Sequence, residues 1–314
     1  MRYAPVGVLQ HAGAIIMGSG YFRFMLGEFE CACLLDGYVD YPVQNHYANI
    51  PREQVDVELR RRNLPVDVVT TPYTYLFVNT GRHRILVDMG AGTVMKSTGH
   101  LTHSLEAAGI EPASIDTVII SHAHPDHIGG TLDEHGAPIY SNATYYIGKD
   151  ERDFWYSDLA STKTPVIFVK IARSNLDPLK ERTVIVDGQC EVVPGVWLMP
   201  APGHTPGHMV VEFRSGAHKL LYISDTVLQP LHLEEPGWLP IYDILPDKAA
   251  VSKHEVFDRA VKEHLLVLGQ HFQPFPSLGY VEKQSTGWKW TPISIAAGAV
   301  CLTEFQTQTK QVIG

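Results

Sequence analysis

The sequence Ser-His-Ala-His-Pro-Asp-His-Ile-Gly-Gly, from Ser121 to Gly130, places four side chains that can bind metal within six residues. The run before it, residues 115–120, is apolar and rich in β-branched residues, which is typical of a buried strand. The two glycines at its end let the backbone turn tightly. We therefore expect a strand end followed by a loop that carries His122, His124, Asp126 and His127.

The spacing of these four side chains predicts two neighbouring metal sites. In extended backbone, alternate side chains share a face, so His122 and His124 can reach one ion together. Pro125 disfavours helical geometry at His124 and preserves that alternation. Asp126 and His127 are adjacent and diverge, so they can serve a second ion. Imidazole nitrogen suits zinc and a carboxylate can complete a site, whereas four merely solvated loop residues would leave the pattern unexplained.

The pattern His-x-His-x-Asp-His resembles the signature of the metallo-β-lactamase superfamily. The resemblance implies an α/β fold, a metallo-β-lactamase-like αββα four-layer sandwich of two mixed sheets, with metal ligands on loops at one edge. It also implies three ligands further along the chain, which it assigns to His204, Asp225 and His271. The implied first site contains His122, His124 and His204, the implied second site contains Asp126, His127 and His271, and Asp225 bridges them.

The sequence around each downstream residue fits a ligand at a strand end. Proline and glycine flank His204 and favour a loop after an apolar run. Asp225 ends the apolar run 218–225, and His271 follows the apolar run 265–268. Chance poorly explains a complete set in the order that the resemblance requires.

Other polar residues near these runs are expected to support the site or to take no part in it. By resemblance, Asp88, which ends an earlier apolar strand, is expected to orient a histidine ligand. His208 begins the next strand and is expected to form hydrogen bonds rather than bind metal. Three competing histidines fall at helix or loop positions typical of solvated side chains: His232, His254 and His264.

The composition is that of an ordinary globular protein and argues against several classes. Hydrophobic residues make up 45% of the 314 residues and charged residues 19%. The net charge of −9 argues against a surface for nucleic acid or anionic membranes, both of which need clustered Lys and Arg. No run approaches the ~18 apolar residues of a membrane span. No convincing signal peptide is present, so we expect a cytoplasmic protein.

The chain is expected to form a single hydrolase domain, residues 21–314, after an N-terminal arm, residues 1–20. No low-complexity tract or linker divides it. The four cysteines contain no Cys-x-x-Cys pair, which favours reduced, mostly buried thiols over a disulfide scaffold. The run 218–225 echoes the run 82–88, since both are apolar and end in aspartate, which suggests two similar halves packed face to face.

Apolar periodicity and turn residues predict the remaining elements. Asp36 and Gly37 predict a hairpin turn between strands at 21–36 and 38–42. The other expected strands are residues 73–79, 84–88, 138–147, 183–186, 192–199, 218–225 and 265–268. The expected helices are residues 100–108, 150–160, 167–176 and 247–264, with a short helix that begins near residue 51.

The two implied ions predict hydrolytic chemistry. Two divalent ions, most simply zinc, with cobalt, manganese or iron as alternatives, would share one water and lower its pKa towards ~7. The bridging hydroxide would attack carbon or phosphorus, and Asp126 or Asp225 could take the proton afterwards. No Ser, Cys or Lys nucleophile is required, and the sequence contains no motif for one.

Looser similarity extends to the methyl parathion hydrolase branch, which is dimeric and related to lactonases. It covers residues 21–37, 203–211, 247–268 and 279–292. That branch walls its leaving-group pocket with aromatic side chains, and the implied candidates here are Trp155, Phe272 and Phe275. A plain core position for Trp155 is an equal alternative. Acyl-homoserine lactonases often have a tyrosine three residues after the bridging aspartate, where this chain has Leu228.

These features favour a homodimeric, dinuclear hydrolase that cleaves lactones or aryl esters, with organophosphate triesters as side substrates. The alternative within hydrolases is a dedicated phosphotriesterase. Two further alternatives are a mononuclear iron persulfide dioxygenase, which uses a related motif, and a non-catalytic binding protein with a vestigial site. The complete ligand set argues against the last alternative.

Overall fold

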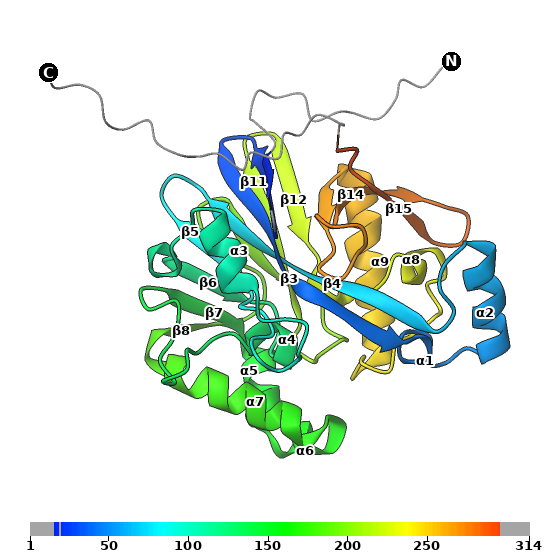
Figure 1. The fold of residues 1–314 in the computed structure, drawn as a ribbon, viewed down its shortest axis with the longest axis horizontal. Coiled ribbons are helices and arrows are strands. Elements are labelled where there is room, and N and C mark those ends of the chain that lie inside the picture. The colour runs from blue at the N-terminus through cyan, green and yellow to red at the C-terminus, as the bar shows by residue number, and fades with distance from the viewer. Residues whose placement is uncertain (1–15, 19, 296–314) are drawn as a thin grey trace, which may run out of the picture.

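Two β-sheets packed face to face form the centre of the molecule (Figure 1). The computed structural model describes residues 16–18 and 20–295. Within them, the first sheet has the order β1-β2-β3-β4-β5-β6-β7-β8 and the second has the order β15-β14-β13-β12-β11-β10-β9. The expected α/β architecture of two mixed sheets is confirmed.

The first sheet changes from antiparallel to parallel pairing at β5. Its strands are β1 Ile16–Gly18, β2 Tyr21–Leu26, β3 Phe29–Pro42, β4 Val68–Asn79, β5 Arg84–Val87, β6 Thr117–Ile120, β7 Thr144–Gly148 and β8 Thr183–Val186. β5 pairs antiparallel with β4 and parallel with β6. Strand β6, Thr-Val-Ile-Ile, is buried along its whole length, as expected of an internal parallel strand without a polar face.

The second sheet makes the same change at β12. Its strands are β9 Cys190–Val193, β10 Val196–Pro200, β11 Met209–Ser215, β12 His218–Tyr222, β13 Leu266–Leu268, β14 Leu278–Lys283 and β15 Trp288–Pro292. β12 pairs antiparallel with β11 and parallel with β13. The two runs that echo each other in the sequence, β5 and β12, therefore occupy equivalent places in the two sheets.

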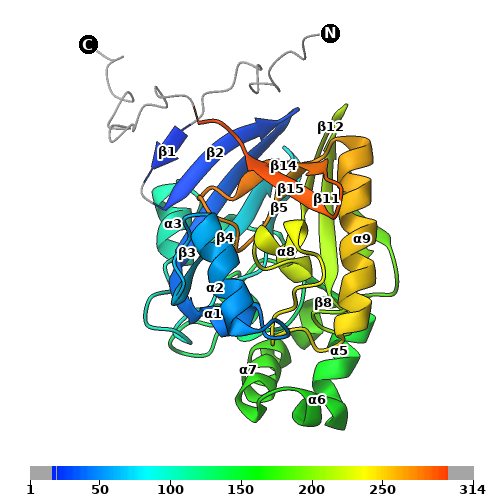
Figure 2. The same ribbon diagram turned by 90° about the vertical axis from the view of Figure 1, so that its right-hand side faces the viewer.

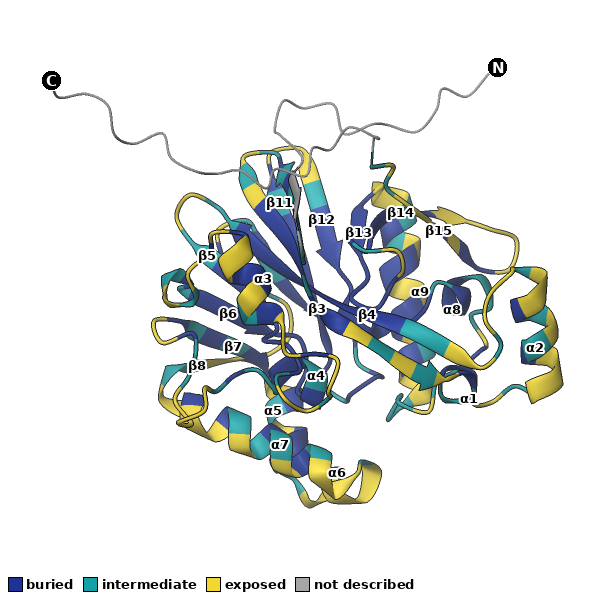
Figure 3. Ribbon diagram, viewed as in Figure 1, coloured by how far each residue is buried: buried dark blue, intermediate teal, exposed yellow. Residues whose placement is uncertain are grey.

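Helices cover the outer faces of both sheets and complete four layers (Figures 1 and 2). They are α1 Val43–His46, α2 Arg52–Arg61, α3 Leu101–Ala107, α4 Pro125–Ile128, α5 Lys149–Tyr156, α6 Asp158–Lys163, α7 Val166–Leu176, α8 Leu231–Glu234 and α9 Pro246–Glu263. Helices α3 to α7 pack on the first sheet, and α9 packs on the second. A third apolar core fills the space between the sheets, so both sheets are buried on their inner faces (Figure 3).

The predicted hairpin turn at Asp36 and Gly37 is wrong. Strand β3 continues through both residues, and its register against β4 shifts there, which makes a β-bulge. The buried Asp36 carboxylate accepts hydrogen bonds from the N–H groups of Ala91 at 3.0 Å and Leu101 at 2.7 Å. A Cβ on Gly37 would lie 2.0 Å from the carbonyl oxygen of Ser97. The Asp-Gly pair therefore serves a bulge with close backbone approach rather than a turn.

Other predicted elements exist with different bounds. The predicted helix 150–160 is divided at Ser157 into α5 and α6, and the predicted strand 192–199 is divided into β9 and β10. The predicted strand 138–147 is shorter, because β7 begins only at Thr144. Each error extends regular structure across a short connection, namely Ser157, residues 194–195 and residues 138–143.

Two predictions fall partly outside the described residues. Of the predicted arm 1–20, residues 16–18 form strand β1 at the edge of the first sheet, and most of the rest lies outside the described residues. Cys31 and Cys33 are free and buried in β3, whereas Cys301 lies outside the described residues. Within the described part of the chain, no helix combines the length and apolar character needed to cross a bilayer.

Candidate metal centre

The seven residues predicted as ligands lie together where strand ends of the two sheets meet. Each follows the C-terminal end of β6, β10, β12 or β13. Loops at the carboxyl ends of strands are the usual place for ligands in α/β folds. Their donor atoms form two groups, within each of which all atoms lie within 4.8 Å of one another: His122, His124 and His204, and then Asp126, His127, Asp225 and His271.

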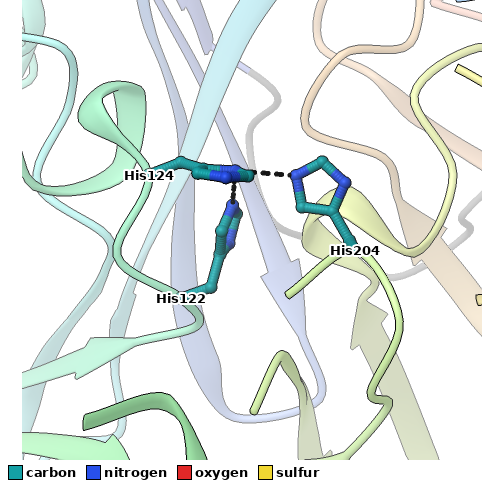
Figure 4. A group of neighbouring side chains, drawn as sticks. All are labelled: His122, His124 and His204. Carbon is teal, nitrogen blue, oxygen red and sulfur yellow. Dashed lines mark hydrogen bonds between the residues drawn. The ribbon is translucent and has the colours of Figure 1, made fainter. Parts of the chain in front are cut away.

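The first group consists of three histidine rings whose nitrogens face one another (Figure 4). His122 Nε2 lies 3.1 Å from His124 Nδ1, which in turn lies 2.9 Å from His204 Nε2. The backbone at His124 is extended, and Pro125 begins α4 immediately after it. The structure thus has the alternation that the spacing predicts, and three imidazole nitrogens converge on one point.

The second group combines two carboxylates with two histidines. His271 Nε2 lies 3.4 Å from Asp126 Oδ2 and 3.2 Å from Asp225 Oδ1. His127 Nε2 lies 3.5 Å from an oxygen of each of the same two carboxylates. This group therefore carries two negative charges where the first group has imidazole rings alone.

Asp225 lies between the two groups. Its Oδ2 is 3.2 Å from His204 Nε2 and 3.9 Å from His122 Nε2, while its Oδ1 faces the second group. Oδ1 is buried and has no hydrogen-bond partner among the described residues. Burying such an oxygen is costly unless positive charge lies beside it. The donor set and this unpartnered oxygen together fit a pair of divalent ions with Asp225 between them.

Burial and neighbouring charges set the protonation of the ligand rings. Burial lowers the pKa of His122, and lowers that of His124 to about 3, so both rings are held in the neutral form that binds metal. Burial also lowers the pKa of His204 and His271, but the charge of Asp225 and the hydrogen bonds to neighbouring carboxylates together outweigh it, and both pKa values rise to about 9. The carboxylates therefore attract positive charge to this point.

Two aspartates accept hydrogen bonds from the Nδ1 atoms of ligand rings, one ring in each group. Asp88 Oδ2 accepts a hydrogen bond from His127 Nδ1 at 2.9 Å. Asp243 Oδ1 accepts one from His204 Nδ1, also at 2.9 Å. A carboxylate that accepts the Nδ1 hydrogen bond fixes the tautomer in which Nε2 is available to a metal. It also makes the imidazole a stronger metal ligand.

Asp88 and His208 have further contacts that support the ligand loops. Asp88 is fully buried and also accepts a hydrogen bond from Ser121 N at 2.8 Å. His208 Nε2 accepts a hydrogen bond from Asp225 N at 3.1 Å, and its Nδ1 donates to Ala201 O at 3.1 Å. Both nitrogens of His208 are therefore engaged with backbone, so this ring positions Asp225 and offers no free nitrogen to a metal.

A buried carboxylate, Glu151 of α5, joins the loop after β6 to the loop after β10. It accepts hydrogen bonds from Ala123 N at 2.8 Å, Thr205 Oγ1 at 2.5 Å, Gly207 N at 3.2 Å and Trp155 Nε1 at 2.6 Å. Burial raises the pKa of Glu151, and the four hydrogen bonds partly offset that rise. These two loops carry the three histidines of the first group, so Glu151 holds them at a fixed separation.

A cavity of about 240 Å³ opens onto both donor groups. Beyond the ligand residues its walls are mainly aromatic and apolar, and they include Tyr41, His46, Met95, Phe168, Leu228 and Tyr242. Leu228 therefore does face the cavity, at the position where the sequence departs from the tyrosine of acyl-homoserine lactonases.

The three aromatic residues predicted to wall the substrate pocket do not line this cavity. Trp155 is fully buried beside His124, with ring centroids 5.6 Å apart, and its indole nitrogen donates to Glu151. Phe272 packs in the core between the second sheet and α9, and Phe275 packs against the core between the sheets. Trp155 and Phe272 are fully buried and Phe275 is partly buried, so Trp155 occupies the core position that the sequence offers as an alternative.

The prediction of a solvated His232 is also wrong. This ring is buried in α8, and its Nε2 donates a hydrogen bond to His46 O at 2.7 Å. His254 and His264 are exposed, as the sequence predicts. His232 is buried because α8 packs against α1 and α2, a contact between distant segments that the local sequence does not reveal.

Comparison with known proteins identifies the family. Residues 68–271, more than half of the chain, match the model of the metallo-β-lactamase superfamily. The chain belongs to this superfamily. Among its curated relatives is the N-acyl homoserine lactonase AiiA of Bacillus thuringiensis subsp. kurstaki, 26% identical over 179 residues. That match covers 56% of this chain and 64% of the relative, so it spans less than two thirds of the lactonase.

Two solved structures of the superfamily are similar over most of the chain. One is AidC, a dizinc quorum-quenching lactonase in complex with a product, with a TM-score of 0.82, 26% identity, and coverage of 88% of this chain and 98% of that one. The other is the hydrolase AbOPH, with a TM-score of 0.81, 27% identity and the same coverage. The relatives and neighbours of this chain are thus metal-dependent hydrolases, and the similarity to the lactonase branch agrees with the sequence.

Proposed function

We propose that this protein is a dinuclear metal-dependent hydrolase whose main substrates are lactones and aryl esters, with organophosphate triesters as secondary substrates. The observation that carries the proposal is the Asp225 carboxylate between two complete donor groups, with a buried oxygen that has no hydrogen-bond partner among the described residues. The similarity to lactonases supports the choice of substrate class.

Each donor group has a distinct part in the proposed reaction. When bound, two divalent ions, zinc in our proposal, would supply a nucleophile from water at neutral pH and polarise the oxygen under attack. His122, His124 and His204 would hold the first ion, and Asp126, His127 and His271 the second, with Asp225 shared between them. Asp126 or Asp225 would then accept the proton that the reaction releases.

The cavity supports a compact apolar substrate with an ester-like group at the metal end. Its volume of about 240 Å³ and its aromatic walls suit a lactone ring or an aryl leaving group. Leu228 cannot donate a hydrogen bond to a carbonyl. The hydroxyls of Tyr41 and Tyr242 are neutral hydrogen-bonding groups on the cavity wall. We also propose a homodimer, on the sequence similarity to the dimeric methyl parathion hydrolase branch.

Metal removal and reconstitution test the proposal. Chelation of the full-length protein should abolish hydrolysis of a lactone panel, and zinc, cobalt or manganese should restore it with two ions per chain. Comparison of kcat/KM for lactones, aryl esters and paraoxon-like triesters ranks the substrate classes, and a dominant triester rate would favour a dedicated phosphotriesterase. Full activity after verified metal removal would overturn the proposal. One iron per chain with oxygen uptake on a persulfide would establish the dioxygenase instead.

A further inference from the structure

Two tyrosine hydroxyls pair at the wall of the cavity beside the metal centre. Tyr41, near the end of β3, lines the cavity and is partly exposed, and its hydroxyl forms a hydrogen bond with that of Tyr73 in β4. Tyr73 is only 1% exposed, and its ring lies edge-on to the ring of His271 with centroids 4.9 Å apart. The hydroxyl pair is therefore anchored against the second donor group, and Tyr41 is the member that faces the cavity.

The surroundings of the pair decide which hydroxyl donates to the other. Only one proton can lie between two hydroxyl oxygens, so the second proton needs another acceptor. Met95 Sδ lies 3.6 Å from Tyr73 OH and 3.8 Å from Tyr41 OH, and a thioether is a weak acceptor. The buried Tyr73 hydroxyl has no other partner among the described residues, so it donates to Tyr41 and the Tyr41 proton is left for an acceptor in the cavity. A hydroxyl that accepts a hydrogen bond is polarised by it and becomes a stronger donor.

The charges of the metal centre favour Tyr41 over Tyr242, the other tyrosine of the cavity wall. Burial raises the pKa of Tyr41, and the carboxylates of Asp126 and Asp225 raise it further. Burial also raises the pKa of Tyr242, but of these two carboxylates only Asp126 adds to the rise. Tyr41 is therefore a neutral donor, and it is the tyrosine on which the carboxylate shared by both donor groups acts.

The proposed reaction requires a hydrogen-bond donor away from the metal end of the cavity. The oxygen under attack is polarised at the metal end, whereas negative charge also develops on the leaving oxygen as the acyl C–O bond breaks. No Lys or Arg is among the described residues that line the cavity, and the ring nitrogens of His46 are inaccessible. The hydroxyl of Thr71 is directed at Val69 O, 3.5 Å away. The tyrosine hydroxyls are the donors that remain.

We propose that Tyr41 is a catalytic residue whose hydroxyl donates a hydrogen bond to the leaving oxygen of the substrate, with Tyr73 behind it as a positioning residue. The proposal rests on the hydrolysis of lactones and aryl esters proposed above. As the acyl C–O bond breaks, the leaving oxygen takes the electron pair, and the Tyr41 hydrogen bond stabilises this anion while the tyrosine keeps its own proton. The proton that Asp126 or Asp225 accepts from the attacking water then neutralises the leaving oxygen. The contribution of Tyr41 is greatest where that oxygen is most basic.

The test compares Tyr41→Phe with Tyr73→Phe in the zinc-loaded full-length protein, on one substrate with a strongly basic leaving oxygen and one without. The lactone γ-caprolactone releases an alkoxide, and p-nitrophenyl acetate releases the much less basic p-nitrophenolate. Tyr41→Phe should lower kcat/KM for the lactone by about 10- to 100-fold, the range for a hydrogen bond to a charged oxygen, and for the aryl ester by less than about threefold. Tyr73→Phe leaves the Tyr41 hydroxyl in place and should lower kcat/KM for either substrate by less than about threefold.

Stability and metal content separate catalysis from structure, because both variants break the same hydroxyl pair. The two variants should unfold at the same temperature as each other, and Tyr41→Phe should bind as much zinc as the wild type. Equal losses on the two substrates in Tyr41→Phe, equal lactone losses in the two variants, or loss of zinc from Tyr41→Phe would overturn the role of Tyr41 while the proposed function stands. A selective loss on the lactone in Tyr242→Phe instead of Tyr41→Phe would also overturn it. A wild type that hydrolyses neither substrate would overturn the proposed function and, with it, this role.

Discussion

The two donor groups of the metal centre lie side by side but differ in charge and in what supports them. The first consists of three histidines, and Glu151 fixes the loops that carry them. The second has two carboxylates with two histidines, and the buried Asp88 holds one of its rings. A cation gains more from the charged group, so the two ions should bind with unequal affinity, the second group more tightly.

Removing the residue that the groups share should weaken metal binding in both of them. Asp225→Ala takes away the carboxylate that faces both groups, and we expect less than one ion per chain. Hydrolysis should fall by more than about 100-fold, the upper range for residues that only orient a ligand. Metal analysis and kcat/KM on a lactone provide the measurement, with the exposed Asp187→Ala as control. Retention of both ions would contradict the bridging role.

Each group contains one histidine whose Nδ1 is bound by an aspartate. Substituting these aspartates one at a time should change the affinity for one ion without changing the affinity for the other. Asp88→Asn should weaken the second ion, and Asp243→Asn the first, each by about 10–100-fold. Asp88 should have the larger effect, because it is fully buried and also binds Ser121. Titration of the metal-free variants with zinc resolves the two steps. A matching loss at both steps in either variant would show that the groups are not supported independently.

A smaller effect should appear in the pH dependence of stability. In the metal-free protein the pKa of His204 and of His271 is raised to about 9, so each contributes stability that is complete below pH ~6.5 and is lost as pH rises through 9. One of these histidines belongs to each group. The unfolding temperature of the metal-free protein should therefore fall between pH 7 and 9.5.

Bound ions displace those two protons, so the metal-loaded protein should lack this alkaline decline. Thermal unfolding of both forms across this pH range provides the comparison. Asp243→Asn should reduce the part of this alkaline decline in unfolding temperature that is due to His204. A metal-free protein with constant stability from pH 7 to 9.5 would show that the carboxylates do not hold these protons.

Sequence reasoning succeeded where a short motif follows an apolar strand. Strand alternation and Pro125, both local properties, place His122 and His124, whereas Asp126 and His127 lie in the short helix α4 and not in the expected loop. Asp225 and His271 likewise follow apolar runs, so their positions at strand ends could be predicted. The two mixed sheets followed from the resemblance that this motif carries, and the model matched by the chain confirms the family.

Sequence reasoning failed where distant segments meet. No sequence pattern distinguishes Glu151 and Asp243 from other acidic residues, and only tertiary packing brings them against the ligand loops. Trp155 was assigned to the cavity by resemblance, although its spacing of four residues from Glu151 was a signal that the two share a helix face. The packing of α8 against α1 depends on contacts between segments 186 residues apart, which no local pattern encodes.

The close packing of the loop after β10 against Glu151 links helix α5 to metal binding by the first donor group. A Cβ on Gly207 would lie 1.9 Å from Glu151 N, so the loop after β10 rests directly on the first turn of α5. Docking of that helix and capture of an ion by the three histidines are then reciprocal events, because each stabilises the other. Loading the first group should slow amide hydrogen exchange in α5 even though none of its residues faces the ion.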